Sequence, residues 1–263
     1  MRNTFRIFLI VLVAALMSTA CSEKIDLKIK NAPPGLVIEG NLNDQAGPYY
    51  VLISKSKLFT DNNSFTGVPA AVVVISDDAG NSDTLTESIA GLYQTNTMQG
   101  IVGRTYHLRV TAEGTTYDSY CKMQSPVDID SIALSTETGF RGDVKKVANI
   151  LVQDPGAVPN YYRVMSILNG GISTGFDIHR DRLWDGKLRS FGVPHSDFHS
   201  GDTLQVNLLS IDEHLYNYFA EFNDNQNNFG APAAPANPDP VFTPAALGYF
   251  SAHSIKSKTV IIP

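Results

Sequence analysis

The stretch that most constrains the fold is an alternating segment near the middle of the chain. Apolar and polar residues alternate through Thr105–Thr111, so one face of an extended strand would carry Tyr106, Leu108 and Val110. The turn residues Glu113-Gly114 then lead into a second strand-like run, Thr115–Cys121. Period-2 alternation closed by a glycine turn is typical of a β-hairpin. The segment therefore predicts antiparallel β-structure.

The sequence before Ser125-Pro126 breaks into further short strand-like runs. These runs are Leu36–Gly40, Tyr49–Ser56, Ala70–Ser76, Thr84–Thr86 and Gly91–Thr95. Ala70–Ser76 has an unbroken apolar run, which predicts a strand that is covered on both faces. Several short strands separated by turns predict a β-sandwich over residues 36–125.

Residues 126–263 are predicted to form a second β-rich domain. Its strand-like runs are Val127–Leu134, Val144–Gln153, Asn160–Leu168 and Thr203–Ile211. Phe176–Phe191 contains Trp184 and the turn Asp185-Gly186, which predicts a hairpin. Gly248–Ala252 and Lys258–Ile262 are expected to be two closing strands, with the last one paired into a sheet. The fold class that follows is all-β.

One amphipathic helix is predicted near residues 211–223. Four large apolar side chains recur at helical spacing, and they are Leu215, Tyr218, Phe219 and Phe222. Ser210 and Glu213 have the spacing of a capping box at the start of a helix. The apolar stripe is interpreted as core packing rather than as a ligand surface. A proline-rich loop, residues 229–244, follows the helix, and loops of this length are usually functional or mobile.

The first twenty residues have the pattern of a secretory signal peptide. Arg2 and Arg6 precede the apolar run Ile7–Met17, which is too short to span a bilayer. Small residues then lead directly into Cys21, an arrangement that resembles a bacterial lipobox, in which the cysteine is diacylated and becomes the mature N-terminus. Residues 21–35 would form a lipidated tether. The alternative is an ordinary signal peptide with a coincidental cysteine.

Composition and missing motifs exclude several functional classes. A net charge of −6 without a basic patch predicts no nucleic-acid partner. The chain has two cysteines, so lipidation of Cys21 would leave Cys121 without a disulfide partner, and Cys121 is expected to be a small buried hydrophobe. The sequence has no nucleophile elbow, P-loop, dinucleotide fingerprint or zinc motif. We therefore predict no catalytic residues and no cofactor.

Two groups of residues are weak candidates for a binding site. His195, Asp197 and His199, with His179 and Asp181 upstream, contain the residue types of a metal site. The flanking Pro194 and Ser200-Gly201 favour a solvated loop instead. A second group, Tyr161, Tyr162 and Trp184, is a speculative stacking platform for a sugar or a peptide, although aromatic residues in strands more often form core.

Two resemblances extend these inferences. Val68-Pro69-Ala70, Gly91-x-Tyr93 and the Gly103-to-Val110 segment resemble prealbumin-like, carboxypeptidase-regulatory-type domains, in that order. The leader, the LVIEG strand at Leu36–Gly40 and the segment Ala246–Ala252 together resemble a family of Bacteroidota lipoproteins known as a domain of unknown function, four-two-four-nine. That resemblance implies an outer-membrane lipoprotein, often encoded beside a TonB-dependent transporter, and no established activity.

The sequence thus predicts a non-enzymatic binding or accessory protein of nutrient uptake, anchored by lipid to the outer membrane. Its expected partners are that membrane and a TonB-dependent transporter. The face of the membrane that it occupies is left open. A lipid-anchored hydrolase or metal-binding protein and a structural surface module are the alternatives.

Overall fold

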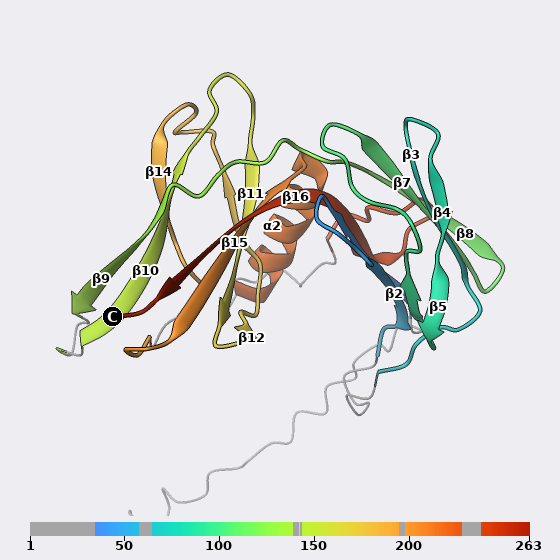
Figure 1. Cartoon of the computed structure of the whole chain (residues 1–263). Helices are drawn as coiled ribbons and strands as arrows, with labels where there is room; N and C mark the ends of the chain where they lie inside the picture. Colours follow the sequence, from blue (N-terminus) through green and yellow to red (C-terminus); the bar gives the residue numbers. More distant parts are fainter. Residues whose placement is uncertain (1–34, 58–64, 139–141, 143, 195–197, 228–237) are drawn as a thin grey trace, which may run out of the picture. The chain divides into compact units, whose positions relative to one another are not determined.

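The predicted all-β class is confirmed by the structure. The computed structural model of the 263-residue chain describes residues 35–57, 65–138, 142, 144–194, 198–227 and 238–263. Strands form several sheets there, and α2 (Glu213–Asn227) is a single helix beside them (Figure 1). In this described part of the chain, no helix is long and apolar enough to cross a membrane.

The first half of the described chain contributes strands to two sheets. One sheet has the order β4-β3-β7-β8 and consists of β3 (Val72–Asp77), β4 (Ser82–Thr84), β7 (Thr105–Ala112) and β8 (Thr115–Lys122). The other sheet receives β1 (Leu36–Asn43), β2 (Tyr50–Lys55), β5 (Thr86–Ile89) and β6 (Leu92–Gln94). The hairpin predicted from the alternating segment is β7–β8, which pairs from Thr105 opposite Lys122.

The alternating apolar face of β7 forms the centre of the first core. Tyr106, Leu108 and Val110 are fully buried, together with Ile38 and Ile53 from the opposing sheet. Two predictions in this region were wrong. The run Ala70–Ser76 is covered on one face only, because Val72 is 56% exposed. The run Thr84–Thr86 is not one strand, since the chain passes from β4 to β5 there and these strands belong to different sheets.

The second half of the chain forms another layered core. One layer has the order β14-β10-β9, with β9 (Ser131–Thr138), β10 (Val144–Gln153) and β14 (Leu188–Gly192). The facing layer contains β11 (Tyr161–Leu168), β12 (Gly171–Ile172), β13 (Asp177–Arg180) and β15 (Thr203–Ile211). Alternate residues of β10, β11 and β15 are buried between these layers, among them Ile150, Val164 and Val206.

The hairpin predicted over Phe176–Phe191 was wrong in its pairing. The predicted turn at Asp185-Gly186 is present, and Gly186 has a positive φ of 69°. The strands on either side of it separate, however, because β13 pairs with β11 and β14 pairs with β10. The connection therefore crosses from one layer to the other instead of folding back on itself.

The last strand, β16 (Leu247–Ile261), joins the two halves. Its first part pairs in parallel with β1, and its second part pairs antiparallel with β15. Figure 1 shows β16 as one long arrow that runs from one half of the described chain to the other. The predicted pairing of the C-terminal end into a sheet is confirmed, but the two predicted closing strands are one. Because β16 serves both halves, Pro34–Pro263 forms one compact unit, and the domain boundary at Ser125-Pro126 stays a prediction.

Helix α2 lies against the long sheet that β16 completes. Leu215 and Phe219 are buried against the side chains of β11, β13, β15 and β16, so the predicted core stripe is present. The predicted capping box was wrong. Asp212 caps the helix by accepting a hydrogen bond from the Leu215 amide on Oδ1 at 2.9 Å, whereas Ser210 is a buried residue of β15.

Candidate functional site

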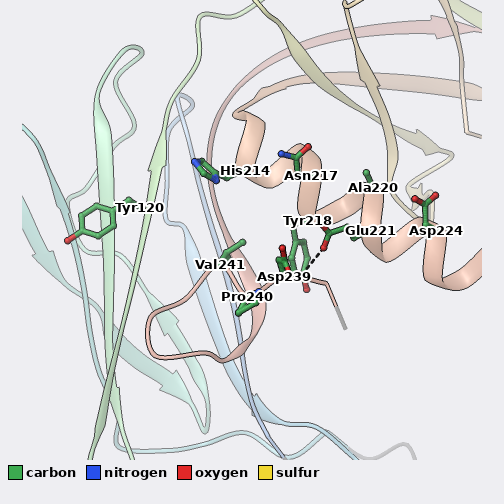
Figure 2. Close-up of a pocket in the computed structure, with 10 residues that line it drawn as sticks. All are labelled: Tyr120, His214, Asn217, Tyr218, Ala220, Glu221, Asp224, Asp239, Pro240 and Val241. Atoms are coloured by element: carbon green, nitrogen blue, oxygen red, sulfur yellow. Dashed lines mark hydrogen bonds between the residues drawn. The ribbon is translucent and has the colours of Figure 1, made fainter. Parts of the chain in front are cut away.

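An open groove of about 520 Å³ lies beside helix α2. Its lining comes from three separated segments, namely β8, α2 and the end of the proline-rich loop (Figure 2). The lining residues are Tyr120, His214, Asn217, Tyr218, Ala220, Glu221, Asp224, Asp239, Pro240 and Val241. We call this hollow the α2 groove.

The two faces of α2 explain why the groove is polar. One face is held in the core by Leu215 and Phe219. The helical spacing then directs His214, Asn217 and Asp224 away from that core, and all three are exposed. The burial of one helix face thus presents the other face as the wall of the groove.

The opposite wall is fixed to both β8 and α2. Asp239 donates its amide hydrogen to Glu221 Oε2 at 2.7 Å, which ties this segment to the helix (Figure 2). Phe242 is buried in the first core, and Thr243 exchanges two backbone hydrogen bonds of 2.9 Å with Asp118 of β8. The groove therefore has a wall that is anchored at both ends.

A second, more apolar hollow of about 360 Å³ shares part of this wall. It has Tyr218, Asp239 and Pro240 in common with the α2 groove, and Leu36 and Leu247 add apolar surface. Burial raises the pKa of Tyr218, so its phenol stays neutral at physiological pH. Both hollows together offer aromatic and carboxylate groups at one continuous site.

The charge of the α2 groove is predominantly negative. Glu221, Asp224 and Asp239 provide three carboxylates, and His214 is the basic residue type among the lining side chains. Tyr120 is 63% exposed, and its ring stacks on His107 with 4.3 Å between centroids and 6° between planes. The arrangement is suited to a cationic ligand group that can also pack on an aromatic ring.

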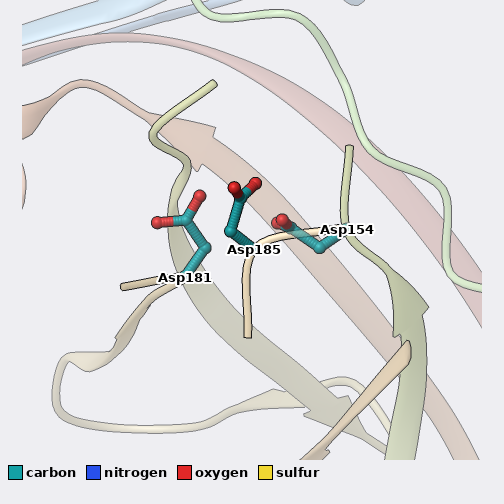
Figure 3. A group of neighbouring side chains, drawn as sticks. All are labelled: Asp154, Asp181 and Asp185. Carbon is teal, nitrogen blue, oxygen red and sulfur yellow. The ribbon is translucent and has the colours of Figure 1, made fainter. Parts of the chain in front are cut away.

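A separate group of three carboxylates comes from the connection between β10 and β11 and from the connection between β13 and β14. Ligand oxygens of Asp154, Asp181 and Asp185 all lie within 4.8 Å of one another (Figure 3). Asp154 accepts hydrogen bonds from the Tyr162 hydroxyl at 2.5 Å and the Gly186 amide at 3.0 Å. An oxygen-only set of this kind would suit a hard cation such as Ca²⁺ better than zinc.

The electrostatics of this carboxylate group follow from its burial. Desolvation raises the pKa of Asp181, and the negative charges of Asp154 and Asp185 raise it further. The Asn160 amide opposes this shift by donating to Asp181 Oδ2 at 2.9 Å. Sequence reasoning placed Asp181 with the histidines; the structure places it with two other aspartates.

The aromatic residues predicted as a stacking platform do not lie on one face. Tyr161 and Tyr162 are consecutive residues of β11, so Tyr161 faces the helix side and packs on Tyr216, whereas Tyr162 is fully buried between the layers. Trp184 stacks on Tyr162, with 5.9 Å between ring centroids, and is partly exposed. Trp184 lines a surface hollow.

The predicted histidine group is only partly described. His195 and Asp197 lie outside the described residues. The amide of His199 donates to Asp202 Oδ2 at 2.7 Å, which closes a turn. His179 stacks on Phe191 with 4.2 Å between centroids, and its Nε2 lies 3.2 Å from Asp177 Oδ1.

Of the two cysteines, Cys21 lies outside the described residues. Cys121 is a buried free thiol, and its Sγ accepts a hydrogen bond from the Ala252 amide at 3.1 Å. Burial raises the pKa of this thiol, which keeps it protonated and unreactive. The interpretation of Cys121 as a small buried hydrophobe is confirmed.

Sequence reasoning missed the α2 groove because its walls meet only through tertiary structure. The apolar stripe of the helix predicts core packing, and the polar residues between those positions form no sequence motif. The one available signal was the proline-rich loop 229–244, whose end supplies Asp239 and Pro240. The interpretation of this loop as functional or mobile stays a prediction.

Comparison with known proteins gives a family but no activity. The family model described as "Domain of unknown function (DUF4249)" matches residues 22–259. A search of curated proteins found no match. Among solved structures, a segment of two fibronectin type-III domains from chicken tenascin is 12% identical, with 68% of this chain and 92% of that chain covered and a TM-score of 0.22.

Proposed function

The chain belongs to the DUF4249 family, whose description assigns no activity, and from this premise we propose that it is a non-enzymatic binding protein. The α2 groove is its binding site, and the occupant is a basic segment of a partner protein. Three carboxylates and the exposed Tyr120 ring along one open hollow support this proposal. Lysine or arginine side chains would pair with the carboxylates and stack on the ring.

The geometry of the groove favours binding over catalysis. Glu221 is engaged with the Asp239 amide, and the lining side chains are distributed along an open surface rather than converging on one point. An open groove with fixed walls also needs little rearrangement when a segment docks, which lowers the entropic cost of association. The observation that carries the proposal is this anchored, negatively charged groove.

The leader supplies the cellular context of the proposal. Cys21 would carry the lipid, residues 21–35 would be the tether, and the outer membrane would hold the protein beside a TonB-dependent transporter. The partner segment would then belong to that transporter, and the protein would act as an accessory component of nutrient uptake. These steps rest on the sequence pattern around Cys21 and on the resemblance described above.

The proposal can be tested by charge reversal in the full-length, lipidated protein. Asp224→Lys with Asp239→Lys reverses two exposed carboxylates of the groove. After extraction in mild detergent, a TonB-dependent transporter should copurify with the wild-type protein, and its recovery should fall at least about tenfold with this double variant. The matched control is Asp130→Lys with Glu137→Lys, which makes the same charge change at two exposed positions away from the groove.

The controls separate the proposal from its alternatives. Equal recovery of the transporter with both double variants would refute the groove as the binding site. Absence of any transporter with the wild-type protein would refute the accessory role and favour a structural surface module. Mass spectrometry of the mature protein would test the anchor, since Cys21→Ser should abolish both lipidation and retention in the membrane fraction.

A further inference from the structure

A third surface hollow, separate from the α2 groove and from the apolar hollow beside it, is lined by cationic and apolar side chains. It has a volume of about 390 Å³, and its lining residues are Arg180, Arg182, Leu183, Trp184 and Arg189. All five come from β13, β14 and the connection between these strands. We call it the arginine hollow. Three of the five lining residues are arginines, in a chain whose net charge is −6.

The local structure holds this connection in place. Gly186 donates its amide hydrogen to the buried Asp154 carboxylate, and two tight turns follow from the bonds Trp184 N–H to Asp181 O at 2.7 Å and Lys187 N–H to Trp184 O at 2.9 Å. The Trp184 ring packs on Tyr162 and Phe191 in the second core. The aromatic wall of the hollow is therefore fixed by the core and not by a mobile side chain.

Within the described part of the chain, none of the three arginines forms an ion pair, and the Arg180 guanidinium lies over the Tyr216 ring at 5.7 Å from its centroid. Among the described residues, no acidic side chain lies within 4.0 Å of Arg180, Arg182 or Arg189. The acidic neighbours in the same connection are turned to other partners, since Asp181 binds the Asn160 amide and Asp185 binds the Ala157 amide at 2.8 Å. Like charges that gather without counterions repel one another, and an anionic ligand would relieve this repulsion.

We propose that the arginine hollow binds an anionic saccharide, in which a sugar ring packs beside Trp184 and carboxylate, sulfate or phosphate groups pair with the arginines. A planar guanidinium can donate two parallel hydrogen bonds to such a group, which gives both strength and direction. A fixed indole offers an apolar surface to the C–H face of a sugar ring. The site is independent of the proposed function of the α2 groove.

The hollow fits a discrete saccharide better than a membrane surface. A lipid headgroup layer is flat and favours a projecting patch of basic and apolar side chains. Leu183, which is 87% exposed, would provide such a projection, but the three arginines and Trp184 border a concave space. Concave sites with an aromatic wall and a few charged groups are typical of small-molecule sites.

The position of the tryptophan provides a direct assay. The chain contains one tryptophan, so all tryptophan emission comes from Trp184, which lines this hollow. We expect a saturable change in its emission on titration of the folded protein with tetragalacturonate. Maltotetraose, an uncharged tetrasaccharide, should produce no saturable change at the same concentrations. Raising the salt concentration should weaken the charged interaction.

The arginines can be tested without disturbing the core. Arg182→Gln with Arg189→Gln removes two exposed charges and should raise the half-saturation concentration at least about tenfold, because each charge-assisted hydrogen bond contributes more than a neutral one. Lys145→Gln with Lys187→Gln is the matched control, since both lysines are exposed and neither lines the hollow. This control should bind like the wild-type protein.

Three outcomes would overturn the proposal. The first is that the wild-type protein gives no saturable signal up to about 10 mM tetragalacturonate, a concentration above the dissociation constants of ordinary ligands. The second is that the two double variants bind tetragalacturonate equally well. The third is that the wild-type protein binds maltotetraose as well as tetragalacturonate. A fourth arm uses vesicles that contain phosphatidylglycerol. A response to these vesicles without a response to tetragalacturonate would show that the arginines bind a lipid surface instead. Circular dichroism of each variant confirms that the fold is retained.

Discussion

The α2 groove and the arginine hollow differ in both charge and origin. The groove is acidic, and its walls come from β8, α2 and the segment Asp239–Val241, which are far apart in the sequence. The hollow is basic and is formed by β13, β14 and the connection between them, which are close together in the sequence. A site of the first kind depends on long-range pairing, whereas a site of the second kind depends on local turns and on the core beneath it.

The two sites therefore depend on different contacts within the chain. The groove exists because β16 pairs with β1 on one side and β15 on the other, which fixes α2 relative to β8. The arginine hollow exists because Trp184 is held in the core and Asp154 fixes the Gly186 amide. Perturbing β16 should therefore affect the groove first, and perturbing the carboxylates of the connection should affect the hollow.

The largest expected effect is that of Gly248→Ala in β16. Gly248 has a φ of +96°, and a Cβ atom there would lie 2.1 Å from the Ile38 carbonyl oxygen of β1. The substitution combines backbone strain with a clash that cannot be relieved by a side-chain movement, so the free energy of unfolding should fall by about 4 kcal/mol. Urea denaturation followed by circular dichroism measures this change.

Gly103→Ala is the matched control for that experiment. Gly103 has a similar φ of +87°, but a Cβ atom there would have no neighbour within 4 Å. Its cost should be limited to the left-handed conformation, about 1–2 kcal/mol. If both substitutions destabilise the protein equally, the close approach of β16 to β1 does not determine how the groove is assembled.

The next effect concerns the dependence of stability on pH. Burial and, to a smaller extent, the nearby Arg163 charge lower the pKa of His253 in β16 to about 4. Because this folded-state pKa lies below the ordinary value of about 6.5, the neutral imidazole contributes stability above pH 6.5, and this stability is lost as the pH falls towards 4. The loss should approach roughly 3 kcal/mol.

Replacing the imidazole should remove that part of the pH dependence. His253→Leu should show a flatter profile between pH 6.5 and 4 in urea denaturation. Ser251→Ala is the control, because it deletes the partner of His253 Nδ1 at 2.7 Å but keeps the titrating ring. A His253→Leu profile that is as steep as the wild-type profile would show that another group controls this window.

Much of the strand content could be predicted from local pattern. Val144–Gln153 and Thr203–Ile211 are observed with the predicted bounds, because alternation and turn residues are properties of short segments. The pairing of β13 and β14 could not be predicted in this way, since each strand finds its partner in a different layer. The polar residues in the middle of β16 likewise suggested a break where the sheet continues.

The candidate sites were less predictable than the strands. Trp184 was predicted as a possible ligand residue; it is partly exposed and lines the arginine hollow, and its binding role stays a prediction. The grouping with Tyr161 and Tyr162 did not hold, because neighbouring residues of a strand point to opposite faces. The carboxylates of the α2 groove gave no sequence signal, since solvated acidic residues are common on helix surfaces.

The smallest expected effect is that of Asp181→Asn beside the arginine hollow. The raised pKa of Asp181 means that the wild-type protein loses stability as the pH rises above the ordinary value for aspartate. The amide can still accept the Asn160 hydrogen bond but removes the repulsion from Asp154 and Asp185. The variant should be more stable at pH 7 by roughly 0.5 kcal/mol, since Asp185 is exposed and solvent screens its charge.

This gain should disappear in acid, where the wild-type carboxyl is protonated. Urea denaturation at pH 7 and at about pH 3.5, below the ordinary aspartate pKa, compares the two states. A variant that is less stable than the wild-type protein at pH 7 would show that the Asp181 charge is needed where it lies. Such a result would indicate that the three carboxylates hold a cation and that repulsion among them does not determine stability.

The most direct test of the account is site-specific photocrosslinking of the full-length protein in intact cells. A photoreactive phenylalanine analogue placed at Asp224, an exposed groove position, should form a crosslink to a TonB-dependent transporter. The same analogue at Glu137, an exposed position on β9, should form none. A crosslink to the transporter from Glu137 and none from Asp224 would contradict the assignment of the α2 groove as the binding site.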